Sequence, residues 1–302
     1  MELRYLKYFV AVAQELHFGR AAQRVGIVQP ALSQQIKALE EELGTPLLRR
    51  NKRRVELTPA GRVFLGEARK TLAQAEQAMQ AARRAGRGET GHLAIGFVSS
   101  AAYGQLINAF RLMRARFPGV TLSLQDLTSE EQVGDLKAQR LDVGLVRPPV
   151  QNAEALAMRI LWREPLMVAL SQRHPLAREK AIPLAALKDE PFLQVPRDLA
   201  PGFYDQILQH CARAGFVPEV FQEARTFQTI INLIAAGMGL ALVPESLREL
   251  RHRGVVYRPL KAPAPTSELA ALWRREDASP VLAHFLEILW QIAGLKPPGA
   301  KR

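Results

Sequence analysis

Residues 21–43 read AAQRVGIVQPALSQQIKALEEEL, two apolar repeats separated by one glycine. The apolar residues follow helical spacing on both sides of Gly26. Glycine adopts the left-handed conformation that ends many helices, and proline is tolerated in a first helical turn. We therefore predict a helix that ends at Gly26, a tight turn filled by Ile27 and Val28, and a second helix that begins at Pro30.

The second of these helices separates apolar from polar side chains. Its apolar residues recur at intervals of four, three and four, which predicts one buried stripe of Leu32, Ile36, Leu39 and Leu43. Four polar residues share the opposite, exposed face: Gln29, Ser33, Gln34 and Lys37. Amide, hydroxyl and ammonium groups on a helix after a tight turn are typical of a helix-turn-helix that reads base edges. A helical hairpin with a merely solvated polar face is the alternative. Further helices are predicted over residues 3–14 and from Phe18.

The chain is basic, and the excess is concentrated near its start. It has 41 Lys and Arg against 29 Asp and Glu, and residues 1–91 hold 16 basic and 9 acidic residues. Within residues 49–54, RRNKRR, five of six positions are basic. We expect a short hairpin wing between Leu48 and residues 55–57, from which Arg53 or a neighbour enters a minor groove while others contact phosphates. A charge run that is only solvated remains the alternative.

A long helix follows the basic segment. Thr58 is a suitable N-cap and Pro59 a suitable first residue. Large and small apolar residues then alternate at intervals of three and four: Leu65, Ala68, Leu72, Ala75, Met79 and Ala82. The small residues of such a seam would let two copies of the helix approach closely, and packing against its own domain is the alternative. Residues 83–91, RRAGRGETG, are predicted to form a hinge.

From His92 onward, strand patterns alternate with helix patterns, which predicts an α/β fold. The first strand, HLAIGFV, leads at Ser99 and Ser100 into a predicted helix, and Thr128 and Ser129 occupy the same kind of junction. Free backbone N–H groups and a hydroxyl at such a junction favour a carboxylate or phosphate ligand. Simple helix capping is the alternative. Arg147 ends a strand and either pairs with an anionic ligand or lies at the surface.

Residues 3–50 followed by LTPAG resemble the N-terminal domain of LysR-type transcriptional regulators, and most closely the regulators of aromatic-acid breakdown. The resemblance implies three parts: a mainly α-helical winged helix-turn-helix over residues 1–58, a linker and dimerisation helix over 59–87, and a two-lobed periplasmic-binding-protein-like α/β domain over 88–302. Lobe I would take residues 92–163 and 267–296, and lobe II residues 164–266. The DNA-contacting positions would be Gln29, Pro30, Ser33, Gln34 and Arg53. Many relatives carry arginine where this chain has Gln34.

The same resemblance implies an effector in the cleft between the lobes. APGFYDQIL, residues 200–208, is similar to the segment that lines the pocket of the aromatic-acid regulators, which implicates Pro201, Gly202 and Phe203. Phe227 lies near the start of a helix expected to face the cleft, with core packing as its alternative. The effector is expected to be a small carboxylate, an aromatic acid or a ring-cleavage product, with no cofactor. Expected partners are double-stranded DNA with a partly palindromic site, RNA polymerase and further copies of the chain in a homodimer or homotetramer, with activation as the outcome.

Several other classes of function lack their sequence signatures. Cys211 is the single cysteine, so it forms no intrachain disulfide or cysteine-only metal site, and we expect a small buried side chain. The six histidines are scattered, and no metal site is predicted. No nucleophile elbow, Walker loop or HExxH motif occurs, which argues against an enzyme. The start does not resemble a signal peptide, and the most apolar run is too short to span a membrane, so we expect a cytoplasmic protein and no membrane partner. A solute-binding transport component matches the larger half but not the basic N-terminal domain.

Overall fold

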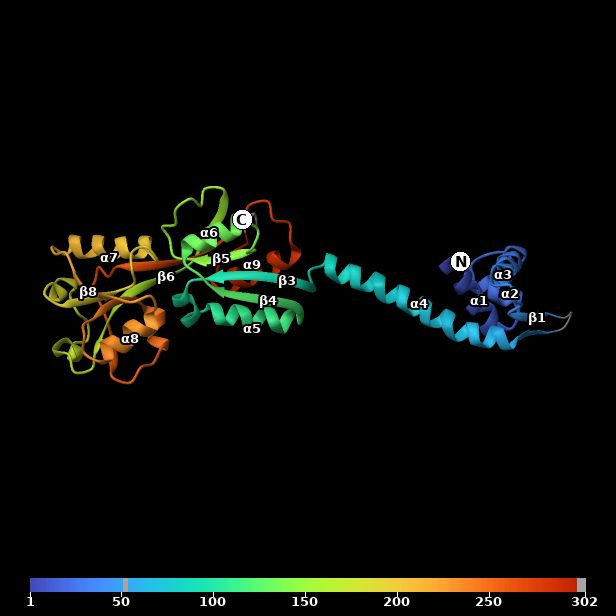
Figure 1. Cartoon of the computed structure of the whole chain (residues 1–302), viewed down its shortest axis with the longest axis horizontal. Coiled ribbons are helices and arrows are strands. Elements are labelled where there is room, and N and C mark those ends of the chain that lie inside the picture. The colour runs from blue at the N-terminus through green and yellow to red at the C-terminus, as the bar shows by residue number, and fades with distance from the viewer. Residues whose placement is uncertain (51–53, 298–302) are drawn as a thin grey trace. The chain divides into compact units, whose positions relative to one another are not determined.

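The computed structural model describes residues 1–50 and 54–297, which divide between two units, Met1–Arg84 and Ala85–Arg302. The first unit contains α1 (Leu3–Glu15), α2 (Phe18–Val25), α3 (Gln29–Leu43), β1 (Leu48–Arg50), β2 (Val55–Leu57) and most of α4 (Pro59–Gly86), as Figure 1 shows. β1 and β2 pair antiparallel as a short hairpin. This is a helix-turn-helix unit with a wing.

The turn between α2 and α3 forms at Gly26, as the sequence predicts. Its φ is 74°, and its N–H donates to the carbonyl of Ala22 at the end of α2. The helices enclose a core in which α1 contributes Leu6 and Phe9. α3 contributes Leu32, Ile36 and Leu39, each 0% exposed.

Two details of the predicted turn and stripe are wrong. Val28 does not fill the turn but is 69% exposed, because it lies in extended backbone where neighbouring side chains point to opposite sides and only Ile27 packs on the core. Leu43 is 38% exposed because it lies in the last turn of α3, where the chain reverses at Gly44.

α4 begins against the core of the first unit. Thr58 accepts a hydrogen bond from the N–H of Gly61 at 2.9 Å, which caps the helix as expected. A Cβ at Gly61 would lie 2.1 Å from the carbonyl oxygen of Leu47, so only glycine permits this approach. Ala68 is buried in the core, but Met79, later in the same predicted seam, is 48% exposed. The seam therefore packs on its own unit in its first half only.

The second unit is built on a seven-stranded sheet and a separate pair of strands. Its strands are β3 (Thr90–Phe97), β4 (Gly119–Asp126), β5 (Val143–Val146), β6 (Leu156–Ser171), β7 (Pro191–Gln194), β8 (Glu219–Glu223), β9 (Ala241–Pro244), β10 (Val255–Pro259) and β11 (Thr266–Arg274). Its helices are α5 (Leu106–Arg116), α6 (Ser129–Lys137), α7 (Pro201–Arg213), α8 (Phe227–Ala235) and α9 (Pro280–Ile292). Four 3₁₀ turns are η1 (Ser99–Tyr103), η2 (Pro175–Arg178), η3 (Leu184–Leu187) and η4 (Glu245–Glu249).

The long strand β6 divides this unit into two lobes. Its first part pairs with β11, which in turn pairs with β5, while β3 lies between β5 and β4 in parallel. Its second part pairs with β9 and β10. β7 and β8 form the separate parallel pair. Figure 1 shows β6 running from one lobe into the other.

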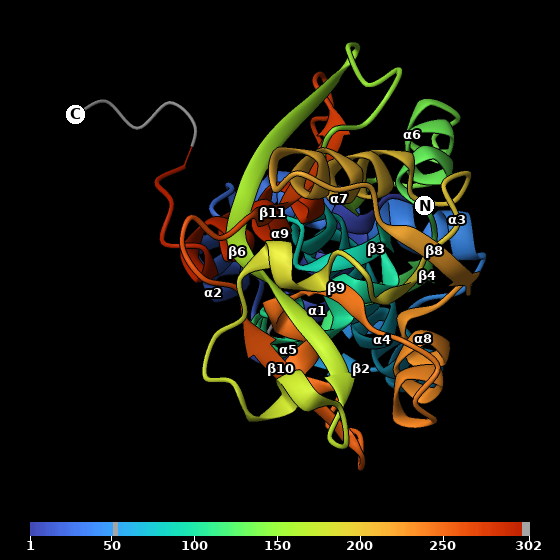
Figure 2. The same cartoon turned by 90° about the vertical axis from the view of Figure 1, so that its left-hand side faces the viewer.

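Each lobe has helices on both faces of its strands. In the first lobe, α5 and α9 pack on one face and α6 on the other. In the second lobe, alternate residues of β6 face opposite ways, so that Val168 packs with α7 while Ala169 packs with α8. Figure 2 shows α7 and α8 on opposite sides of these strands. No helix in the described part of the chain is both long and apolar enough to cross a membrane.

Candidate functional site

The polar face of α3 is accessible in the first unit. Gln29, Pro30, Gln34 and Lys37 are exposed, and Ser33 is half-buried. The ammonium group of Lys37 lies 3.6 Å from a carboxylate oxygen of Glu41, an exposed pair that leaves it free to exchange partners. Beside Gln29, the exposed methyl groups of Val28 offer an apolar contact that suits thymine. Val28 was not among the predicted DNA-contacting residues, because its place beside Gly26 suggested a side chain buried in the turn.

The hairpin after α3 carries the basic side chains. Arg49 is exposed on β1 opposite Glu56 of β2. Arg54 is also exposed, and its guanidinium lies 3.3 Å from a carboxylate oxygen of Glu56. Arg53, the residue predicted to enter a minor groove, lies outside the described residues.

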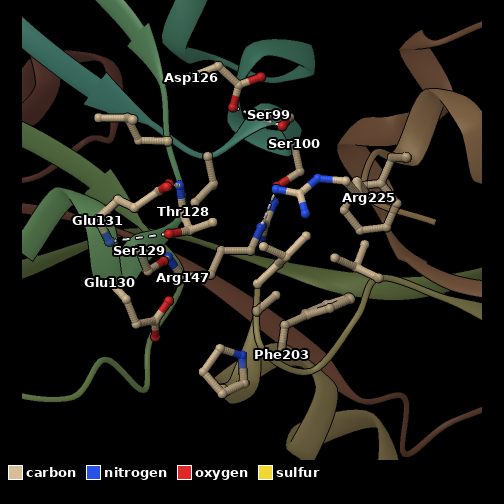
Figure 3. A pocket seen from close by; sticks show the side chains of 18 of the residues that line it. Ser99, Ser100, Asp126, Thr128, Ser129, Glu130, Glu131, Arg147, Phe203 and Arg225 are labelled. Carbon is tan, nitrogen blue, oxygen red and sulfur yellow. Dashed lines mark hydrogen bonds between the residues drawn. The ribbon is translucent and has the colours of Figure 1, made fainter. Parts of the chain in front are cut away.

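The second unit contains a cavity of about 320 Å³ between its lobes, a size suited to a small organic ligand. All nine residues predicted to contact an effector line it: Ser99, Ser100, Thr128, Ser129, Arg147, Pro201, Gly202, Phe203 and Phe227. They come from five segments that are widely separated in the sequence. The structure therefore brings the candidate residues together in one place, drawn in Figure 3.

One wall of the cavity is apolar. The rings of Phe203 and Phe227 meet edge to face, with centroids 6.0 Å apart and planes at 79°. Phe227 also packs on the core, so both interpretations of this residue hold. A Cβ at Gly202 would lie 2.4 Å from the carbonyl oxygen of Pro149, so glycine lets α7 approach the first lobe closely. This wall suits the hydrocarbon part of a small molecule.

Arg147 is buried at the back of the cavity and is not a surface residue; only 7% of it is exposed. Its Nε donates to Ser100 Oγ, and one terminal nitrogen donates to Ser267 Oγ, both at 2.8 Å. The other terminal nitrogen donates to Glu164 Oε1, also at 2.8 Å. Burial lowers the pKa of the Arg147 guanidinium, and the adjacent carboxylate of Glu164 opposes that change. Its charge is thus balanced within the protein.

Glu164 connects this arginine to the second lobe. Its other carboxylate oxygen accepts a hydrogen bond from the backbone N–H of Ser246, at the start of η4, at 2.7 Å. Removing one partner of a buried ion pair typically costs about 3–5 kcal/mol. Arg147 and Glu164 therefore hold the two lobes and the hydroxyl of Ser100 in fixed positions.

Two hydroxyls that line the cavity and accept hydrogen bonds from Arg147 still have an O–H to donate. Ser100 Oγ accepts from the guanidinium, and Ser129 Oγ accepts from the backbone N–H of Arg147 at 3.3 Å. A hydroxyl that accepts one hydrogen bond still has an O–H to give. Both serines are buried, 3% and 8% exposed, and both line the cavity. A carboxylate in the cavity is the natural acceptor for such donors.

Their neighbours are already engaged. The hydroxyl of Ser99 donates a hydrogen bond to Asp126 Oδ1 at 2.9 Å. Thr128 caps α6 by accepting from the N–H of Glu131, whose carboxylate accepts from the N–H of Thr128 in return. The capping interpretation therefore holds for Thr128. Ser99 and Ser100 begin the short 3₁₀ turn η1, where the sequence analysis expected an α-helix.

The polar residues near the cavity that were not predicted include Glu164, Ser267 and Arg225. Glu164 and Ser267 lie on strands β6 and β11, which meet Arg147 only in the folded lobe. Arg225 precedes α8 and lines the cavity from the second lobe. None of the three stands in a local pattern that indicates a site. Within residues 1–50 and 54–297, no group of three or more metal-binding side chains is placed to hold a metal ion.

Two family models match nearly the whole chain. Residues 3–62 match the bacterial regulatory helix-turn-helix protein, lysR family, and residues 86–293 match the LysR substrate binding domain. The chain is 42% identical over 288 residues to the HTH-type transcriptional regulator AlsR of Bacillus subtilis (strain 168), covering 95% of each protein. It is 38% identical over 298 residues to the probable cat1 operon transcriptional activator of Acinetobacter lwoffii, covering 98% of each.

A solved relative extends the comparison to DNA. The structure of full-length CbnR in complex with its target DNA superposes with a TM-score of 0.85 at 29% identity, covering 97% of this chain and 100% of that chain. The relatives that match are transcriptional regulators.

Proposed function

This chain belongs to the LysR family of DNA-binding transcriptional regulators, and we propose that it controls transcription in response to a small carboxylate held between its two lobes. Membership of a family of regulators agrees with the prediction that it is not an enzyme. We assign DNA binding to residues 1–58, the linker and dimerisation helix to 59–87, and effector binding to 88–302, with lobe I about 92–163 and 267–296 and lobe II about 164–266.

The DNA-binding part of the proposal rests on α3 and the hairpin. The exposed amide groups of Gln29 and Gln34 suit adenine, and Lys37 suits guanine or phosphate. Exposed Arg49, on the hairpin that follows α3, suits a contact with a phosphate. The complex of CbnR with its target DNA supports the same use of this domain. Paired copies would place two α3 helices in successive major grooves of a partly palindromic site.

One observation carries the effector part: buried Ser100 holds its oxygen toward Arg147 and keeps its proton for a ligand in the cavity. Ser129 offers a second donor, and the rings of Phe203 and Phe227 offer an apolar surface. Hydroxyl donors beside aromatic rings suit an aromatic acid or an unsaturated ring-cleavage product. Arg147 would act on such a ligand through Ser100, because its own charge is paired with Glu164.

The proposed mechanism is linkage between the cavity and the DNA. A ligand that contacts both lobes favours the closed arrangement, and in an oligomer this changes how the DNA-binding domains are held. Coupling of this kind is typically about 1–3 kcal/mol, or roughly 5- to 150-fold in affinity. We propose that the change bends or releases promoter DNA, opens access for RNA polymerase and so activates transcription.

The test is a thermal-shift screen of the full-length protein with benzoate, muconate and phenylpropionate. A ligand at 100 times its dissociation constant stabilises the native state by about 2.7 kcal/mol. We expect Ser100→Ala to lose most of this stabilisation, since a hydrogen bond to a charged group contributes about 1.5–3 kcal/mol.

Ser99→Ala is the matched control, because the hydroxyl of Ser99 already donates its hydrogen bond to Asp126. A loss in Ser99→Ala with full retention in Ser100→Ala would move the contact by one residue. No stabilisation of the wild-type protein by any of the three acids would contradict the aromatic-acid assignment.

A further inference from the structure

Two arginines line the cavity, and they differ in what surrounds their charge. Arg147 is buried and paired with Glu164. Arg225 is exposed, and its side chain makes no hydrogen bond or ion pair with any residue that the structure describes. Figure 3 shows the Arg225 side chain extending from the second lobe toward Ser100 and Arg147. The cavity therefore holds one paired and one unpaired guanidinium.

The position of Arg225 is fixed by the elements on either side of it. The next residue, Thr226, caps α8 by accepting from the N–H of Thr229 at 3.2 Å. α8 is in turn anchored in the core of the second lobe by Ile230, Ile231 and Ile234, each 0% exposed. Arg225 thus leaves the second lobe from a rigid helix start at the edge of the cavity.

Three acidic residues line the cavity, and within the described structure none of them forms an ion pair with Arg225. Asp126 is occupied by Ser99, and Glu131 is occupied by the cap of α6. Burial raises the pKa of the Glu130 carboxyl, with the neighbouring charge of Glu131 acting in the same direction. Because Glu164 balances the charge of Arg147, the guanidinium of Arg225 is the group that attracts an anion to this end of the cavity. The most favourable occupant is therefore a carboxylate placed between Arg225 and Ser100.

We propose that Arg225 is the residue that pairs with the effector carboxylate and that makes the cavity select anions over neutral ligands. This inference rests on the proposed function. It adds that the guanidinium of Arg225 supplies the positive charge that binds a carboxylate effector. Ser100 belongs to the first lobe and Arg225 to the second, so one carboxylate bound to both joins the lobes. The same contact would both recognise the carboxylate and hold the two lobes closed around it.

The experiment compares acids with their uncharged amides on the full-length protein. The probe pairs are acetate and acetamide, benzoate and benzamide, and phenylpropionate and phenylpropionamide, titrated at constant ionic strength with calorimetry. The variants are Arg225→Gln, Arg225→Lys and, as a matched control, Arg213→Gln, an exposed arginine of the second lobe that does not line the cavity. Because Arg225 is exposed and unbonded, its variants are expected to melt at the wild-type temperature without ligand.

We expect the wild-type protein to prefer at least one acid over its amide. Arg225→Gln should weaken binding of the acid by about 10- to 100-fold and leave the affinity for the amide unchanged, because only the charge-assisted hydrogen bond is lost. Arg225→Lys should recover part of the loss, since lysine restores the charge but not the planar fork. Arg213→Gln should bind like the wild-type protein.

Two contrary results would distinguish failure of the Arg225 proposal from failure of the carboxylate-effector proposal. Equal acid affinity in the wild-type protein and Arg225→Gln would overturn the role of Arg225 and leave carboxylate sensing through Ser100 intact. No preference of the wild-type protein for any acid over its amide would overturn both the role of Arg225 and the proposed carboxylate effector.

Discussion

Ser99 and Ser100 are adjacent and carry the same hydroxyl group, yet only one of them has a proton left for a ligand. Asp126 accepts the hydrogen bond that Ser99 can donate, whereas Ser100 accepts a hydrogen bond from Arg147 and keeps its own O–H available. The sequence leaves a one-residue ambiguity here, and the hydrogen bonds favour Ser100 as the donor to a ligand. Whether a serine of the candidate site can bind a ligand therefore depends on whether its hydroxyl already donates a hydrogen bond within the protein.

Single side chains on α3 should likewise determine the affinity for a particular DNA sequence. We predict that Gln29→Ala costs about 1–3 kcal/mol on a sequence selected from a random duplex pool and little on unselected DNA, because a base contact is lost. Gln14→Ala, an exposed glutamine on α1, is the control. Fluorescence anisotropy measures both affinities, and equal losses on both DNAs would make Gln29 a backbone contact.

Cys211 should be unreactive in the folded protein. The thiol is 0% exposed in α7, and burial raises its pKa to about 11. At pH 8 about one thiol in a thousand would be ionised, against roughly a quarter for an unperturbed cysteine. We predict negligible labelling by a disulfide reagent at pH 8 in the native protein and rapid labelling in guanidinium. Rapid native labelling would contradict the buried assignment.

Among the elements, α4 has two different environments along one apolar seam. Leu65, Ala68 and Leu72 pack on the core of the DNA-binding unit, whereas Met79 and Ala82 are exposed. A helix of 28 residues with an exposed apolar stripe gains by packing against a partner. We therefore place the proposed pairing of two chains on the second half of α4.

Met79→Glu should weaken that pairing. Two carboxylates brought into an apolar seam are desolvated and repel each other, so we predict that the dissociation constant of the dimer rises by about tenfold or more. Sedimentation velocity over a range of protein concentrations measures it. Gln77→Glu, which adds the same charge at an exposed position outside the seam, should leave the dimer intact. An unchanged dimer in both variants would place the interface elsewhere.

The elements that follow from local patterns were predictable, and those that depend on distant partners were not. Gly26 marks a helix end by its own chemistry, and the spacing of Leu32, Ile36 and Leu39 gives their burial. The pattern did not predict β7, β8 or β10, because β8 reads EVFQE, without the alternation of a half-buried strand. The partners of Arg147 lie 17, 47 and 120 residues away, a set that no local spacing reveals.

Across the whole molecule, a DNA-binding unit and a ligand-binding unit belong to one chain, and the account requires that they influence each other. In the second unit, two contacts that join the lobes are specific: Arg147 donates to Glu164 at 2.8 Å, and Gln206 donates to the carbonyl of Pro148 at 3.0 Å. A ligand that adds a further contact between the lobes biases their arrangement. By thermodynamic linkage, DNA that favours the same arrangement must also tighten ligand binding.

The most direct test of the account is the affinity and footprint of the full-length protein on its selected DNA, measured with and without a carboxylate that stabilises it. The account predicts a change of roughly 5- to 150-fold in affinity, or a shift in footprint or DNA bend, that Ser100→Ala abolishes. The same affinity, footprint and bend at saturating carboxylate would contradict the central claim that the cavity between the lobes controls the DNA complex.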